Sequence, residues 1–99
     1  MANVTLSRVE KKVEGDVESF YLITPATADH LDTISAQTFL NGRSCVGLDC
    51  FDITSGISRQ TSNDVSGSAT TLSADGDITI GMADGLTNHS CCIRLDVLR

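Results

Sequence analysis

The stretch CCIRLDVL, residues 91–98, alternates apolar and polar side chains more regularly than any other part of the chain. In an extended strand, successive side chains point to opposite faces, so Arg94 and Asp96 share one face and the apolar residues share the other. Because a shift of one residue would bury both charges, this pattern predicts a strand with one face in the core. The predicted core residues of this strand are Cys91, Ile93, Leu95 and Val97.

Two other parts of the chain read as hairpins. In the N-terminal third, the turn signal Glu14-Gly15-Asp16 precedes residues 17–23 (VESFYLI), which are rich in β-branched and aromatic side chains. Further along, residues 70–73 and 77–82 flank Ala74-Asp75-Gly76. In both places a short turn between strand-like runs predicts two antiparallel neighbours.

Asn41-Gly42 is the strongest local turn signal in the chain. Both central residues of a type I′ turn need positive φ, which Asn and Gly tolerate. We therefore expect residues 33–40 and 43–53 to pair as another hairpin. Residues 25–35 are expected to form a loop; the alternative is a short helix that begins at Pro25.

The spacing of these runs predicts the fold class. About seven short strands at intervals of roughly 8–12 residues are typical of an all-β fold, a small antiparallel sandwich or barrel. At 99 residues the chain should form one domain, residues 1–99. Only 4% of the residues are aromatic. The core should therefore be thin, and burial against further copies would add stability, so we expect a homo-oligomer.

Charge and hydropathy exclude several classes of partner. The net charge is −6, and Lys11-Lys12 is the only pair of adjacent basic residues, so neither nucleic acid nor an anionic membrane is an expected partner. Residues 1–12 lack the apolar core of a signal peptide, and no run of eighteen apolar residues occurs. We expect synthesis in a cytosol, where the four cysteines would be reduced, buried thiols; in a secreted chain they could instead form disulfides.

The candidate metal ligands have unsuitable spacing. Cys91 and Cys92 are adjacent, and adjacent strand residues point to opposite faces; Cys45 and Cys50 also differ in parity. We therefore expect one cysteine of each pair to face the core and no zinc site with His89. Asp75-Gly76-Asp77 matches a calcium loop for two ligands only, so we interpret it as a turn and expect no metal.

The sequence contains no recognisable catalytic signature. A cysteine nucleophile needs a histidine base held by a third group, and neither His30 nor His89 belongs to such a motif. No Gly-rich phosphate-binding loop is present. We predict that the protein is not an enzyme, with no catalytic residue and no cofactor.

Three segments carry a resemblance to small structural proteins of tailed bacteriophages. They are the opening MANVTLSRVEKKVEGDVESFYL, the segment YLITPATADHLDTI, and the close, where GMADGLTN precedes CCIRLDVLR. The order of strand, turn, strand and Asp-rich loop is similar to that of virion proteins encoded beside the major capsid gene. This resemblance implies a capsid decoration (cement) protein that binds the major capsid protein on the head surface, often as a trimer, after synthesis in the host cytoplasm. The alternatives are another virion component, in the tail, connector or fibre, or a cytosolic β-sandwich module that binds a ligand.

The predicted contact surface comes from apolar residues in otherwise polar stretches. Residues 25–40 and 55–68 are polar connections that nonetheless carry large apolar side chains. Such side chains would be available to a partner. The candidate interface residues are Leu31, Ile34, Phe39 and Ile57.

Overall fold

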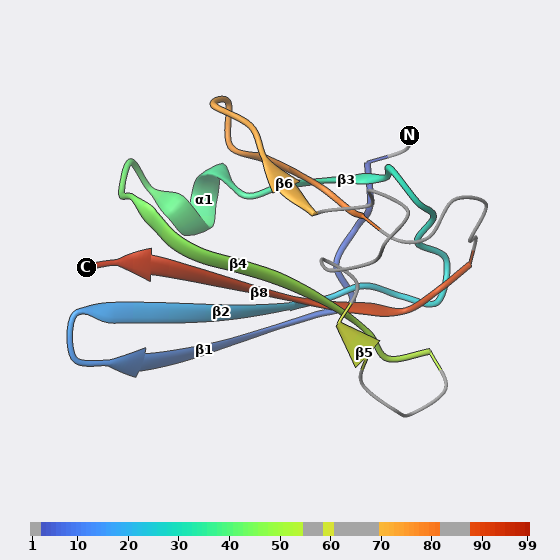
Figure 1. Ribbon diagram of the computed structural model, residues 1–99, viewed down its shortest axis with the longest axis horizontal. Coiled ribbons are helices and arrows are strands. Elements are labelled where there is room, and N and C mark those ends of the chain that lie inside the picture. The colour runs from blue at the N-terminus through green and yellow to red at the C-terminus, as the bar shows by residue number, and fades with distance from the viewer. Residues whose placement is uncertain (1–2, 55–58, 61–69, 82–87) are drawn as a thin grey trace.

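The computed structural model describes residues 3–54, 59–60, 70–81 and 88–99. In these ranges the elements are β1 (Arg8–Glu14), β2 (Val17–Ile23), β3 (Thr33–Ser35), α1 (Gln37–Leu40), β4 (Cys45–Asp52), β5 (Arg59–Gln60), β6 (Thr71–Leu72), β7 (Asp77–Thr79) and β8 (Cys91–Leu98). The larger sheet has the order β1-β2-β8-β4-β5 and the smaller sheet the order β3-β7-β6, with all neighbours antiparallel. Figure 1 shows the smaller sheet over one face of the larger one, which confirms the predicted all-β antiparallel sandwich.

The strand β8 lies at the centre of the larger sheet, between β2 and β4. Its four apolar side chains that point toward the smaller sheet are completely buried, as the alternation in the sequence predicts. They meet side chains from β2, β3, β4 and β7, so both sheets contribute to one core. The buried apolar residues are Phe20, Leu22, Ala28, Ile34, Ala36, Cys50, Ile78, Ile80, Cys91, Ile93, Leu95 and Val97.

Two of the predicted hairpins are present. Glu14 lies opposite Val17, so Gly15 and Asp16 form a two-residue turn, and Gly15 has the positive φ of 59° that this turn needs. In the smaller sheet, β6 and β7 flank the turn that contains Gly76, whose φ is 86°. In both hairpins, the turn residues predicted correctly which two strands are paired.

The hairpin predicted at Asn41-Gly42 is wrong. The strand β3 pairs with β7, and residues 37–40 form α1. Asn41 does take the left-handed conformation, with φ 48°, but it ends the helix, and its N–H donates to the carbonyl of Gln37 at 2.8 Å. Left-handed residues serve helix C-termini as well as type I′ turns, so the two residues carry the chain from the smaller sheet to the larger one.

In the described part of the chain, no helix has the length and apolar character needed to cross a membrane.

The segment after Pro25 is a loop, as predicted, up to Asp32, and the chain then enters β3. Ala28 anchors this loop because its N–H and C=O both bond to the backbone of His89, at 3.0 and 2.9 Å. The side chain of Ala28 is fully buried. The loop is therefore fastened to the start of β8 rather than lying free on the surface.

A β-bulge in β4 changes which residues face the core. The register against β8 shifts between Cys45 and Gly47, so that Cys45 lies opposite Val97 and Cys50 opposite Ile93. Both cysteines consequently point toward the smaller sheet, and Cys45 packs against the core while Cys50 is fully buried. The prediction that only one cysteine of this pair faces the core is wrong, because the bulge inserts one extra residue between them and brings both to the same face.

Candidate functional site

The interface residues predicted from the sequence do not form one exposed patch. Leu31 is exposed, at 42%, but Ile34 is 1% exposed and lies in the core from β3. Phe39 is half-buried, and its ring centroid lies 5.3 Å from that of Phe20. The expected exposure of Ile34 is wrong because β3 covers the core instead of forming a surface connection, whereas the half-buried Phe39 stays a prediction. Ile57 lies outside the described residues.

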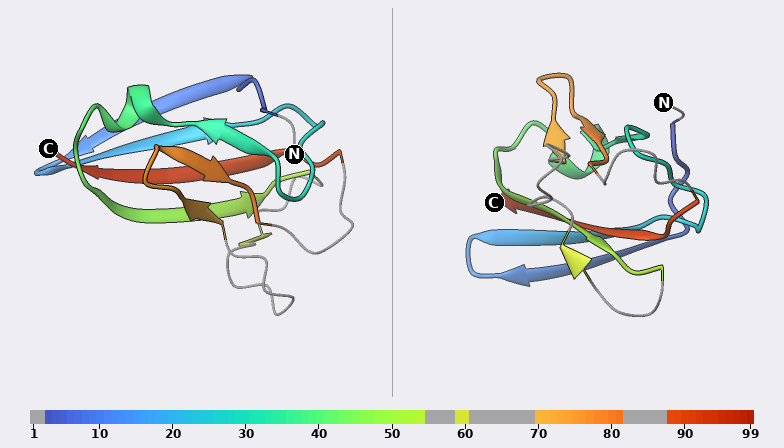
Figure 2. Two further views of the ribbon diagram at one scale, coloured as in Figure 1. Left: turned by 90° about the horizontal axis from the view of Figure 1, so that it is seen from above. Right: turned by 45° about the vertical axis from the view of Figure 1, so that its right-hand side comes forward.

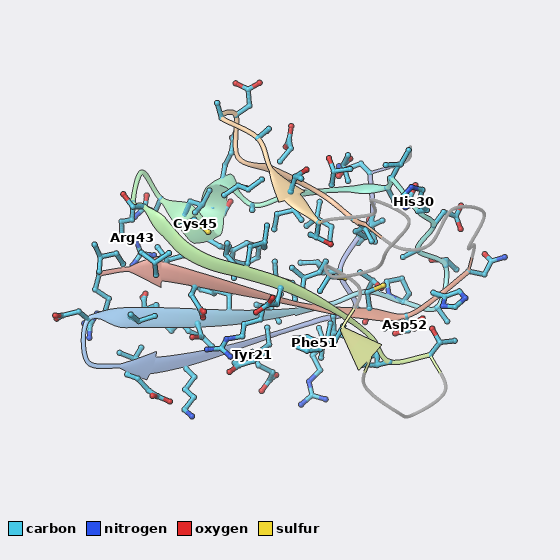
Figure 3. All side chains as sticks on the ribbon, in the orientation of Figure 1. Tyr21, His30, Arg43, Cys45, Phe51 and Asp52 are labelled. Carbon is cyan, nitrogen blue, oxygen red and sulfur yellow. The ribbon has the colours of Figure 1, made fainter. Side chains whose placement is uncertain are left out.

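A different surface is available on the larger sheet. We call the side of this sheet that faces away from the smaller sheet the outer face. Figure 3 shows Tyr21 and Phe51 on this side. Since Tyr21 lies opposite Arg94, and Ser19 opposite Asp96, these side chains share the outer face. A hollow of about 290 Å³ lies between them, lined by Glu14, Val17, Ser19, Tyr21, Val46, Arg94 and Asp96.

Hydrogen bonds hold the polar groups of this hollow in place. One oxygen of Asp96 accepts from the hydroxyl of Ser19 at 2.6 Å and from Nε of Arg94 at 3.2 Å. The hydrogen bond to Asp96 and the charge of Asp96 raise the pKa of Arg94. Its guanidinium lies in the same hollow as Tyr21, its neighbour on β2.

Apolar side chains border the same hollow. Val46 is 54% exposed and Leu98, which lies opposite Val17 on the outer face, is 44% exposed. Tyr and Arg are enriched in protein contact surfaces, and here Tyr21 and Arg94 lie beside the exposed Val46.

A second polar cluster lies where β4 meets the start of β8. Oδ2 of Asp52 is 2.7 Å from Nδ1 of His89, while Oδ1 accepts from the N–H and the hydroxyl of Thr54 at 3.0 and 2.6 Å. Burial raises the pKa of Asp52, but the hydrogen bonds from Thr54 and the contact with His89 outweigh it and lower the pKa. The hydroxyl of Ser90 donates to the carbonyl of Thr24 at 2.9 Å. Asp52 and His89 join the end of β4 to the segment before β8, and Ser90 joins that segment to the residue after β2, so the cluster has a structural role.

The cysteines are placed as packing residues. None of the four forms a disulfide, and Cys91 points into the core while its neighbour Cys92 points to the outer face. The hydrogen bond with Cys50 and burial raise the pKa of the Cys91 thiol far above its ordinary value, and burial raises that of Cys92. Among the residues that the structure describes, no three His, Cys, Asp or Glu side chains converge on a point where they could hold a metal ion.

The outer-face residues were missed in the sequence because their proximity depends on strand register. Alternation in residues 91–98 assigns Arg94 to an exposed face, but residues 17–23 do not alternate, and only the pairing of β2 with β8 brings Tyr21 next to Arg94. No family model, curated protein or solved structure matches the chain. By its fold and this surface, the protein is a small two-sheet β-sandwich with a polar and aliphatic outer face.

Proposed function

We propose that the protein is a non-enzymatic structural protein of a virion, a decoration (cement) protein that binds the head shell of a tailed bacteriophage and stabilises it. The observation that supports a binding role is the outer face, where Arg94 and Asp96 are held in fixed positions beside Tyr21 and the exposed Val46. The choice of the major capsid protein as partner rests on the resemblance of the sequence to small virion proteins.

The outer face offers the two kinds of contact that a shell protein needs. Aliphatic side chains such as Val46 and Leu98 lose water on docking, which provides affinity. The fixed ion pair of Arg94 and Asp96 would set the orientation of the partner. The net charge of −6 would speed the encounter with a basic surface of the shell.

We propose further that the protein acts as a homo-oligomer, with the trimer that the resemblance implies. Stable contacts bury roughly 800 Å² on each partner. The surface of the whole chain is 5550 Å², so one such contact would cover about a seventh of it. A position in the tail, connector or fibre, or a role as a cytosolic ligand-binding module, is the alternative.

The experiment is a co-sedimentation assay with expanded capsids that lack the protein, taken from the phage that carries the gene. We expect the wild-type chain to bind the shells and Val46→Asp to weaken binding at least about tenfold, which corresponds to roughly 1.4 kcal/mol. Leu31→Asp is the matched control, since it adds the same charge at a similarly exposed position away from the outer face.

The outcomes separate the proposals. Loss of binding in Leu31→Asp and not in Val46→Asp would move the contact to the loop before β3. A wild-type chain that binds no shell would contradict the decoration role and favour the alternatives.

A further inference from the structure

In the described part of the chain, β1 pairs only with β2 and so forms an edge of the larger sheet. It is the last strand on one side, and all seven of its residues are exposed. Figure 2 shows it at the margin of the larger sheet farthest from β6. Val9 and Val13 lie opposite the buried Leu22 and Glu18, so they point to the core side of the sheet, yet they remain 40% and 44% exposed. An edge of this kind can pair with a further strand.

The direction of the backbone groups in β1 follows from the neighbouring strands. Two backbone hydrogen bonds flank β2. The N–H of Thr24 donates to the carbonyl of Cys91, and the carbonyl of Asp16 accepts from the N–H of Arg99. Thr24 and Asp16 are both even-numbered, so the backbone groups of the even-numbered residues of β2 point toward β8. The odd-numbered residues of β2 then bond to their partners in β1, which are even-numbered. The backbone groups of Val9, Lys11 and Val13 are therefore left pointing to the free edge.

We propose that β1 pairs antiparallel with β1 of a second copy of this chain, with Lys11 on the two-fold axis. In this register Arg8 lies opposite the partner's Glu14, and Glu10 lies opposite the partner's Lys12. Val9 lies opposite the partner's Val13. Apart from the central Lys11, which lies opposite the partner's Lys11, the strand sequence RVEKKVE is complementary to itself when it is read in the reverse direction.

The charges exclude the neighbouring registers. The two β1 strands can shift past each other only by two residues at a time. A shift of one would place an odd-numbered residue opposite an even-numbered one, whose backbone groups point away from the free edge. A shift of two in one direction places Glu10 opposite the partner's Glu10, and in the other direction it places Lys12 opposite the partner's Lys12. Like charges directly opposite each other destabilise a strand pair, whereas opposite charges stabilise it. The proposed register also contains one like-charge contact, because Lys11 lies opposite the partner's Lys11, but it has four opposite-charge contacts, two between Arg8 and Glu14 and two between Glu10 and Lys12. In both shifted registers, every contact between charged residues of β1 joins like charges. The proposed register is therefore the most favourable of the three.

The pairing also accounts for the exposed valines. Val9 of each copy would lie beside the partner's Val13 on the core side of a continuous sheet, and the two Lys11 side chains would lie between these two valine pairs on the same side. Because the contact repeats by a two-fold rotation, it closes on itself and gives a dimer instead of a filament. A single edge strand of seven residues buries less than the roughly 800 Å² per partner of stable complexes, so the free dimer should be weak.

The test is charge inversion at the pair of Glu10 and Lys12, measured by sedimentation velocity over a range of protein concentrations. Glu10→Lys would face Lys12 of a second copy with lysine, and Lys12→Glu would face Glu10 with glutamate, so each single variant should dimerise at least about tenfold more weakly than the wild type. The double variant Glu10→Lys/Lys12→Glu should recover the wild-type association. An equimolar mixture of the two single variants should also recover it, because each then meets the opposite charge. The assay contains no shells, and the contact does not use the outer face, so the result is independent of the proposed binding to the shell. A dimer would replace the trimer that the resemblance implies.

Circular dichroism and thermal unfolding of the single variants provide the control for folding. Both side chains are more than half exposed, so the fold should be unaffected. The inference would be overturned by a wild-type chain that stays monomeric at every concentration, by single variants that associate as the wild type does, or by a mixture no stronger than its components. A native mass of three chains that these changes leave unaltered would overturn it as well.

Discussion

The side chain of Arg43 joins the two layers of the sandwich. Nη1 donates to Glu18 on β2 at 2.9 Å, while Nη2 and Nε donate to the carbonyls of Phe39 and Leu40 at 2.9 and 3.1 Å. The last carbonyls of a helix have no partner within the helix, and a cation satisfies them well. The side chain of Glu18 is only 12% exposed, so it would be left without its partner if Arg43 were absent.

This pair predicts a loss of stability in acid. The hydrogen bond from Arg43 lowers the pKa of Glu18 below its ordinary value of 4.5. A carboxyl with a lowered pKa in the folded state stabilises the fold above its unfolded pKa, and this stabilisation is lost as the pH falls through the folded pKa. The free energy of unfolding, from urea titrations between pH 7 and pH 3, should fall less steeply below about pH 4.5 in Glu18→Gln than in the wild type. Two parallel curves would contradict this prediction.

At the scale of elements, the bulge in β4 places a glycine directly against a side chain of β8. Gly47 lies opposite Asp96, and a Cβ at Gly47 would approach Oδ2 of Asp96 to 2.7 Å and its Cβ to 3.3 Å. Asp96 cannot easily turn away, because Ser19 and Arg94 both bond to its carboxylate. The absence of a side chain at Gly47 therefore makes room for the polar network of the outer face.

Gly47→Ala should destabilise the protein by about 1–3 kcal/mol, the usual effect of forcing extra atoms into a packed contact. Urea unfolding measures it, and Asp96→Ala in the Gly47→Ala background should recover part of the loss because the obstructing carboxylate is gone. Val46→Ala, one residue away at an exposed position, is the control and should change stability by less than about 0.5 kcal/mol. Equal losses at both positions would show that the strand and not the contact is responsible.

The whole molecule depends on a core that two sheets share. Its aromatic content is small, with one close ring pair in the described residues, Phe20 and Phe39. Most of the buried volume comes from aliphatic side chains of β2, β3, β7 and β8. A domain of this size has a net stability of roughly 5–15 kcal/mol, so the loss of one central contact is a large fraction of it.

Ile93→Asp should therefore abolish soluble expression, because it places a charge at a fully buried position between the sheets. Arg94→Gln, the next residue along β8, faces outward and should keep the fold within about 1 kcal/mol of the wild type. Soluble yield and thermal unfolding of the two variants measure the difference. A tolerated Ile93→Asp would mean that the faces of β8 are assigned wrongly.

The sequence by itself determined the features that depend on neighbouring residues. Alternation in residues 91–98 identified the buried face of β8, and the turn signals at Gly15 and Gly76 identified two hairpins. These signals are local, since side-chain parity and positive φ are properties of a few residues.

Only the tertiary structure decided which distant segments meet. Residues 33–35 pair with β7, so Asn41 ends a helix instead of turning a hairpin, and Ile34 is buried instead of exposed. The register of β2 on β8 creates the hollow at Tyr21 and Arg94, and the order of the strands leaves β1 at an edge. The physical reason is that strand pairing is non-local: several partners satisfy the same local pattern, and the burial of the whole core selects among them.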